Sequence, residues 1–151
     1  MKLKLIILTT LFSFSLSFAQ ENTEYDESLA TELGADQYGM KAYVFCILKT
    51  GSNTTTTPEE KKKLFDGHML NMKKLADENK IIVAGPFRKN DRNYRGIFIF
   101  NCATIEEAEI LVNSDPAVKA KMFEAELTPW YGSATLSKVK DLHKKIVKTK
   151  M

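Results

Sequence analysis

His68 is the residue whose type and position most directly suggest chemistry. The chain has only two histidines, and His68 lies in a charged segment whose apolar residues recur with helical spacing. At about 100° per residue, Leu64, Met72 and Leu75 fall on the same side of a helix as His68, whereas lysines and aspartates occupy the opposite side. His68 therefore lies in the apolar stripe and is predicted to face the interior of the domain.

Two interpretations of this histidine remain open, and Asp115 is part of both. His68 is either a packed core residue bonded to a backbone carbonyl or a general acid or base lining a cavity. Asp115 precedes Pro116, which is typical of a helix N-cap. Its second carboxylate oxygen remains available to a pocket. An aspartate bonded to one imidazole nitrogen fixes the tautomer and leaves the other nitrogen for a substrate. The catalytic hypothesis is therefore a His68–Asp115 pair.

An alternation of strands and helices must position this pair. Strands are predicted at residues 41–49, 81–84, 97–103 and 126–131, and capping sequences at Thr57 and Thr104 begin two helices. The order is β-α-β-β-α-β. Right-handed crossovers then place both helices on one face of a four-stranded antiparallel sheet, which is the α+β ferredoxin-like fold. Phe45, Phe98 and Phe100 are predicted to give the other face an apolar surface that a second copy covers.

Three further residues are candidates for substrate binding. Gly85 and Pro86 are predicted to end a strand, with the backbone N–H of Gly85 available to a cleft. Arg95 belongs to a basic connection that is either a solvated loop or an anion site and that also holds Arg88, Lys89 and Arg92. The chain has no recognisable metal-ligand spacing and no phosphate-binding loop, so no metal and no cofactor are predicted.

The first nineteen residues are typical of a secretory signal peptide. Lys2 and Lys4 precede an apolar run, and Ser17-Phe18-Ala19 supplies small residues before a cleavage point. We therefore expect export to the periplasm or the extracellular space, with no transmembrane segment after cleavage. Removal of residues 1–19 lowers the formal net charge from +3 to +1, which gives little support for a nucleic-acid partner.

The two tails of the mature chain have opposite charges. Residues 20–39 carry six acidic residues and no lysine or arginine, and are predicted to form a flexible or loosely docked arm. Residues 135–151 are basic, with apolar residues at helical spacing, so a helical tail with weak contact to anionic surfaces is predicted. Cys46 and Cys102 are the only disulfide candidates, and both also suit small buried thiols.

Several short motifs resemble the YCII-related (YciI-like) family over about residues 40–134. They are His68, the AGP sequence from Ala84 to Pro86, Gly96, the EEA sequence from Glu106 to Ala108, Asp115-Pro116 and Pro129-Trp130. The resemblance implies a ferredoxin-like fold, a dimer with barrel-like packing of its sheets, and a cleft holding a His–Asp pair. Family function is mostly unassigned, and one characterised kind of member is a dehydrochlorinase of a chlorinated hydroxyquinol-type ring.

Two functional hypotheses follow from the residues and the resemblance together. In the first, the chain is an exported dimeric enzyme that binds a small molecule and performs lyase-type or elimination chemistry with His68 and Asp115. In the alternative, it is a non-catalytic ligand-binding or protein-interaction module of the cell envelope, and the pair is structural. The domain organisation is a signal peptide at 1–19, an acidic arm at 20–39, the YciI-like domain at 40–134 and a basic tail at 135–151.

Overall fold

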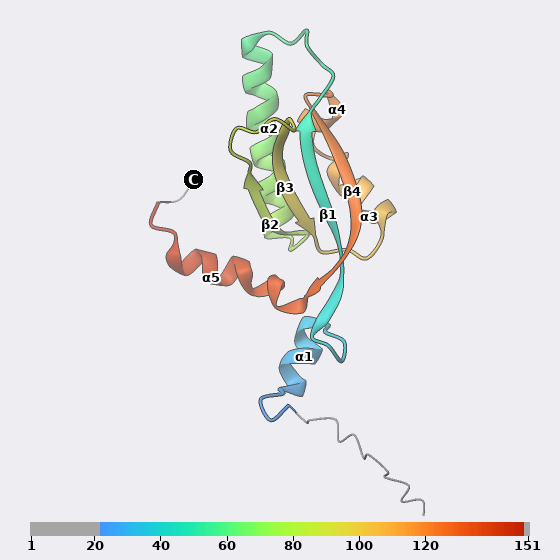
Figure 1. Cartoon of the computed structure of the whole chain (residues 1–151). Coiled ribbons are helices and arrows are strands. Elements are labelled where there is room, and N and C mark those ends of the chain that lie inside the picture. The colour runs from blue at the N-terminus through green and yellow to red at the C-terminus, as the bar shows by residue number, and fades with distance from the viewer. Residues whose placement is uncertain (1–21, 150–151) are drawn as a thin grey trace, which may run out of the picture.

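A four-stranded antiparallel sheet organises the molecule (Figure 1). The computed structural model describes residues 22–149. The strands lie in the order β2-β3-β1-β4, and every neighbouring pair is antiparallel. Their bounds are β1 Met40–Thr50, β2 Ile81–Pro86, β3 Tyr94–Phe100 and β4 Phe123–Ser133. This order, with a helix in each of the two crossovers, is the predicted ferredoxin-like α+β fold.

The helices of the two crossovers begin where the capping sequences predict. In α2 (Pro58–Asp77), the Thr57 side chain accepts a hydrogen bond from the Glu60 backbone N–H, and the Glu60 carboxylate accepts one from the Thr57 N–H. In α3 (Ile105–Val112), Thr104 caps in the same way, but the Glu107 carboxylate accepts from the Ala103 N–H instead. Each cap satisfies backbone donors that the helix itself leaves unpaired.

The main core lies between these helices and one face of the sheet. Side chains alternate between the faces of a strand, so Val44, Cys46 and Leu48 of β1 point to the same side and are buried there. The remaining buried residues of this cluster come from α2, α3, β2 and β3, and they are Leu75, Ile81, Phe98, Phe100, Ala108 and Val112. Figure 1 shows α2 behind the sheet, on the side of this core.

The opposite face of the sheet carries a smaller apolar cluster. Tyr43, Ile82 and Ile99 are buried there, and Leu136 of the short helix η1 (Ala134–Lys138) packs against them. Phe45 lies on this face, as predicted, but Phe98 and Phe100 do not, because β3 pairs with β1 in a register that turns them toward the helices. The strand predicted at residues 81–84 is two residues longer in the structure, since Gly85 and Pro86 belong to β2, which ends at Pro86.

The acidic arm contains a capped helix, α1 (Glu27–Leu33). The Asp26 side chain accepts a hydrogen bond from the Leu29 N–H, and Gly34 ends the helix in the left-handed conformation with φ of 67°. Leu33 is buried, and the Glu32 carboxylate lies 2.5 Å from the Lys138 ammonium, which links the arm to the beginning of the basic tail. The arm predicted as flexible or loosely docked therefore has local structure of its own.

The basic tail continues from η1 into helix α5 (Val139–Ile146), which projects from the body of the molecule (Figure 1). Within residues 22–149, no helix combines the length and the apolar character that crossing a bilayer requires. The predicted signal peptide at residues 1–19 lies outside the residues that the structure describes.

Candidate functional site

The structure brings His68 and Asp115 into direct contact across 47 positions of sequence. His68 lies on α2, with 7% of its surface exposed, and its Nδ1 is 2.5 Å from Oδ2 of Asp115. Asp115 lies just before α4 (Pro116–Lys119) and is 2% exposed. A carboxylate can only accept, so the hydrogen of this bond belongs to Nδ1, and a neutral ring is held with Nε2 unprotonated.

Asp115 uses its two oxygens for different purposes. Oδ1 accepts a hydrogen bond from the Ala117 backbone N–H at 2.8 Å, which caps α4, while Oδ2 is bonded to His68. Asp115 is therefore the N-cap of α4 and the partner of His68 at the same time. The short helix holds the carboxylate in place, and the carboxylate in turn orients the imidazole.

A close approach of two helices makes this contact geometrically feasible. Gly67 precedes His68, and a Cβ atom placed on Gly67 would lie only 2.8 Å from Cγ of Pro116. Pro116 itself follows Asp115, so the missing side chain on α2 lets α4 pack against α2 at the level of the pair. Any larger residue at position 67 would push the two helices apart.

Three phenylalanine rings surround the imidazole of His68. The ring centroids of Phe123, Phe65 and Phe98 lie 5.2, 5.8 and 6.1 Å from it. Among the described residues, no fully buried side-chain nitrogen or oxygen lacks a hydrogen bond, and no described group is bonded to Nε2 of His68. Nε2 therefore retains some exposure, which makes it the atom that a molecule bound beside His68 would meet.

Cys46 lies in the core next to this pair but is not suited to nucleophilic chemistry. Burial, reinforced by the negative charge of Asp115, raises the pKa of the Cys46 thiol to about 12. The thiol is therefore protonated at neutral pH, whereas a nucleophilic cysteine must be a thiolate. Both Cys46 and Cys102 are free in the structure.

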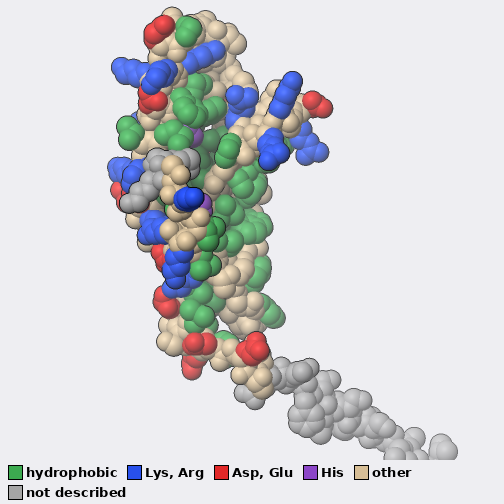
Figure 2. Space-filling model, turned by 90° about the vertical axis from the view of Figure 1, so that its left-hand side faces the viewer, with side chains coloured by type: hydrophobic (Ala, Val, Ile, Leu, Met, Phe, Trp, Pro, Cys, Tyr) green, Lys and Arg blue, Asp and Glu red, His purple; other side chains and the backbone are tan. Residues whose placement is uncertain are grey.

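A cavity of about 620 Å³ opens beside His68, between α2 and the ends of β2 and β3. The predicted substrate-binding residues Gly85, Pro86 and Arg95 all line it, as does His68. Asp115 does not, and it reaches the cavity only through the imidazole. Figure 2, which views the molecule from the side of α2 and β2, shows hydrophobic side chains flanked by lysines and arginines on this face.

Several cavity residues were not assigned to a site from the sequence. Phe65, Met69 and Met72 come from α2, Phe123 from the start of β4, Phe87 from the connection between β2 and β3, and Tyr94 from the start of β3. Helical periodicity identifies the α2 residues as apolar but does not separate a cavity wall from a packed core. No local pattern indicates that Phe123 contacts an imidazole on a distant helix.

The described part of the chain brings together no group of three or more His, Cys, Asp or Glu side chains that could hold a metal ion. A buried imidazole with a fixed tautomer and one available nitrogen is equipped to accept or donate a proton.

The YCII-related domain matches residues 42–131, a range that contains His68, Asp115 and all the residues lining the cavity. A similar solved structure is 5-chloro-2-hydroxyhydroquinone dehydrochlorinase (TftG) from Burkholderia phenoliruptrix AC1100 in complex with 2,5-dihydroxybenzoquinone. It is 21% identical, with a TM-score of 0.42, over 58% of this chain and 92% of the other. No curated protein matches this sequence.

Proposed function

The chain belongs to the YCII-related domain family, and on this premise we propose that it binds a small molecule in the cavity and transfers a proton to or from it. His68 is the general acid or base, and Asp115 is the positioning residue behind it. The observation that carries the proposal is the 2.5 Å bond between His68 Nδ1 and Asp115 Oδ2 at the wall of a 620 Å³ cavity.

An elimination is the reaction class that we propose for this pair. His68 Nε2 removes a proton from a carbon of the bound molecule, and the electrons of that C–H bond form a carbon–carbon double bond. The leaving group departs from the adjacent carbon with its bonding electron pair. The imidazolium, stabilised by the Asp115 carboxylate, then releases its proton to the leaving group or to water. The net change is loss of one HX from the substrate.

The phenylalanines around His68 support this chemistry because they limit the water that competes for the imidazole. In such surroundings the carboxylate of Asp115 acts on the imidazolium with less screening than in water. Gly85 and Pro86 line the same cavity, and a side chain at Gly96 would approach the Gly85 carbonyl oxygen to 3.0 Å. We propose that these residues bind the substrate by shape and through backbone groups.

The mature protein is proposed to be exported, to the periplasm or the extracellular space. This rests on the basic, apolar and small-residue order of residues 1–19. Mass spectrometry of the protein secreted by its native host or a related one should find a chain that begins at Gln20. An intact N-terminus on the exported or cell-associated protein would contradict cleavage at this point.

A homodimer is proposed through the face of the sheet opposite to α2. Phe45 and Ile47 are only partly buried there, and Trp130 remains 39% exposed although its ring stacks on Tyr43. Apolar side chains gathered on one sheet face favour burial against a second copy. The basic helix α5 is proposed to make a weak additional contact with anionic surfaces.

The function is tested with substitutions that separate chemistry from folding. His68→Asn places an amide nitrogen near the position of Nδ1, so the bond to Asp115 is retained while the basic Nε2 is removed. Wild-type protein and variant are incubated with a library of small molecules that have a leaving group next to an acidic C–H bond. Mass spectrometry then detects loss of HX. We expect turnover to fall by about two to four orders of magnitude with nearly unchanged Tm.

The alternative, a non-catalytic ligand-binding or interaction module, predicts a different result. Ligands would bind wild-type protein without being converted, and His68→Ala would lower stability because a cavity and an unpaired Asp115 oxygen remain. Ligand binding without turnover, together with reduced stability of His68→Ala, would replace the enzyme proposal by this one.

A further inference from the structure

We infer that the cavity takes an organic anion with an apolar, ring-sized body, whose negative group is bound by Arg88, Lys89 and Arg95. The inference deepens the proposed function, because it names the ligand class of the same small-molecule site. It rests on the distribution of charge and apolar surface around the cavity, which a neutral ligand would not require.

The charges that line the cavity all have one sign. Arg88, Lys89 and Arg95 line it, and its walls include no aspartate or glutamate. Within residues 22–149, none of these three cations takes part in an ion pair, whereas Lys49, Lys62, Lys73 and Lys138 all do. Like charges held near each other repel, and an anion between them removes that repulsion and accepts their hydrogen bonds.

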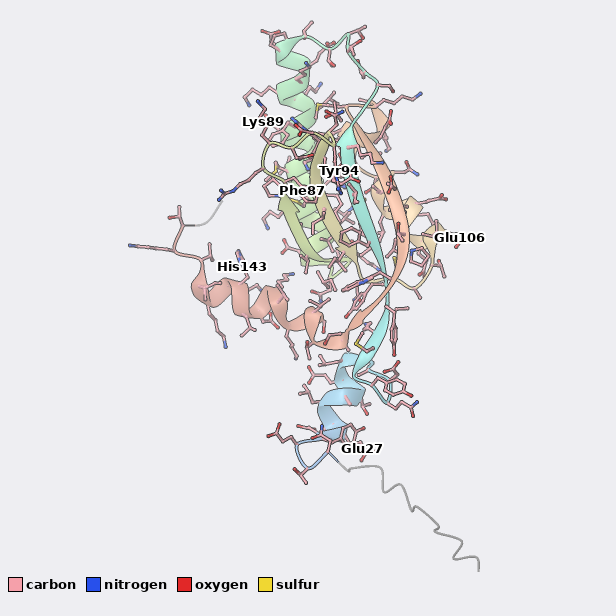
Figure 3. The ribbon with its side chains drawn as sticks, in the orientation of Figure 1. Glu27, Phe87, Lys89, Tyr94, Glu106 and His143 are labelled. Atoms are coloured by element: carbon pink, nitrogen blue, oxygen red, sulfur yellow. The ribbon has the colours of Figure 1, made fainter. Side chains whose placement is uncertain are left out.

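Apart from His68, Asn90 and Asn93, the remainder of the lining is mainly apolar and aromatic. Phe65, Met69 and Met72 come from α2, and Phe87 and Tyr94 stand in mutual contact with ring centroids 5.6 Å apart. Figure 3 shows Phe87, Lys89 and Tyr94 together at the same end of β2 and β3. A ligand that reaches from the cations to His68 must therefore lie along aromatic and thioether surface, which favours a planar apolar body.

The Asn90 side chain bridges the two ends of the loop that supplies Arg88 and Lys89. Asn90 donates from Nδ2 to the carbonyl oxygens of Arg88 and Tyr94, at 2.9 Å each. Its Oδ1 accepts from the N–H groups of Arg92 and Tyr94 at 3.0 and 3.2 Å. The loop backbone is thus held in one conformation without a ligand, so less ordering entropy is lost when an anion binds.

Arg92 provides a matched control within the same loop. It is exposed and belongs to the same basic sequence, but it does not line the cavity. If the basic residues served only to keep the connection solvated, removing the charge of Arg92 would affect ligands as much as removing that of Arg88. If they form an anion site, only the residues lining the cavity matter.

The test compares anionic and uncharged ligands that all carry one benzene ring. Full-length mature protein is titrated with 4-hydroxyphenylacetate, phenyl phosphate and the uncharged 4-hydroxyphenylacetamide, by calorimetry and by ¹H–¹⁵N NMR. We expect at least one anion to bind about tenfold more tightly than the amide, since hydrogen bonds to charged groups exceed those to neutral ones by about that factor. The two anions distinguish a carboxylate site from a phosphate-ester site.

The variants then locate the site. Arg88→Gln, Lys89→Gln and Arg95→Gln combined should remove the preference for the anion over the amide, while Arg92→Gln should alter anion affinity less than twofold. Equal affinity for anions and amide, or equal effects of Arg92→Gln and Arg88→Gln, would overturn the inference, as would no binding by either anion at 10 mM.

The outcomes also separate this inference from the proposed function. A cavity that binds the amide as tightly as the anions, with NMR shifts at His68, would overturn the anion site and leave the small-molecule site intact. Preferential anion binding with no turnover of any library compound by wild-type protein would support the anion site and count against proton-transfer chemistry.

Discussion

Gly67→Ala tests whether the close packing of α2 against α4 is what joins His68 to Asp115. The added Cβ would lie 2.8 Å from Cγ of Pro116, inside the distance that non-bonded carbons tolerate, and a proline ring cannot rotate away. Overpacking of this kind costs about 1–3 kcal/mol. Alanine in place of glycine inside a helix gains about 0.8–1 kcal/mol. The net expectation is a destabilisation of about 0–2 kcal/mol.

The stability change caused by Gly67→Ala should reverse its sign when Cγ of Pro116 is removed. Pro116→Ala deletes Cγ, and the atom then nearest to the new methyl group is the residue-116 Cβ at 3.7 Å, which is ordinary contact. In the Pro116→Ala background, Gly67→Ala should therefore stabilise the protein by about 1 kcal/mol through helix propensity alone. Urea unfolding of all four proteins gives the coupling energy as a double-mutant cycle.

The same four proteins are also compared by the NMR signal of the His68–Asp115 hydrogen bond. In wild-type protein, Nδ1 of His68 lies 2.5 Å from Oδ2 of Asp115. The hydrogen on Nδ1 should resonate far downfield in ¹H NMR, because it is strongly hydrogen-bonded and buried away from water. Gly67→Ala should shift this resonance upfield or broaden it, and Pro116→Ala should restore it in the double variant. Equal stability changes in both backgrounds, with an unchanged Nδ1 proton, would refute the argument that Gly67 sets the distance.

Three further predictions concern other parts of the molecule. Because burial and Asp115 raise the pKa of Cys46 to about 12, a disulfide reagent at pH 8 should modify only Cys102 in folded protein and both thiols in guanidinium. Rapid reaction of Cys46 in native protein would contradict the conclusion that its thiol is buried and protonated. The Asp36 carboxylate accepts a hydrogen bond from the Tyr131 hydroxyl and raises the pKa of Tyr131 to about 12. Since this folded-state pKa lies above the ordinary value of about 10, the contact stabilises the fold below pH 10 and is lost as the pH rises through 12. Asp36→Asn should move one tyrosine transition at 295 nm to lower pH, and an unchanged titration curve would exclude the contact. Finally, Phe45→Glu should convert the proposed dimer to a monomer in light scattering, whereas Leu70→Glu, at an exposed position of α2, should not. A molecular mass unaffected by Phe45→Glu would exclude the open sheet face as the dimer interface.

The helices and the burial of His68 could be predicted from local sequence because their causes are local. Thr57-Pro58-Glu59-Glu60 defines where α2 begins, since the capping bonds join residues three positions apart. The 3.6-residue period then places His68 in the apolar stripe, and it is buried there. The β-α-β-β-α-β order likewise restricts the sheet to few topologies, and the observed strand order is among them.

Strand register and strand ends were predicted less well because they depend on partners elsewhere in the chain. Phe98 pairs with Cys46 and points with it toward the helices, which no pattern within β3 alone indicates. Pro86 remains in β2 opposite Gly96, and it is tolerated because β2 is an edge strand that needs no backbone donor on its outer side. A one-residue difference in pairing reverses the face of every side chain, so these assignments required the assembled sheet.

The sequence by itself determined that His68 would be buried on an amphipathic helix and that Asp115, directly before Pro116, would cap a short helix. Only the tertiary structure decided that Asp115 directs one oxygen to its own helix and the other to His68, because that depends on the spacing between α2 and α4 at Gly67 and Pro116. It also placed Phe123 beside the imidazole and gathered Arg88, Lys89 and Arg95 around one cavity. Such contacts arise from packing between distant segments, and local periodicity contains no information about the distance between them.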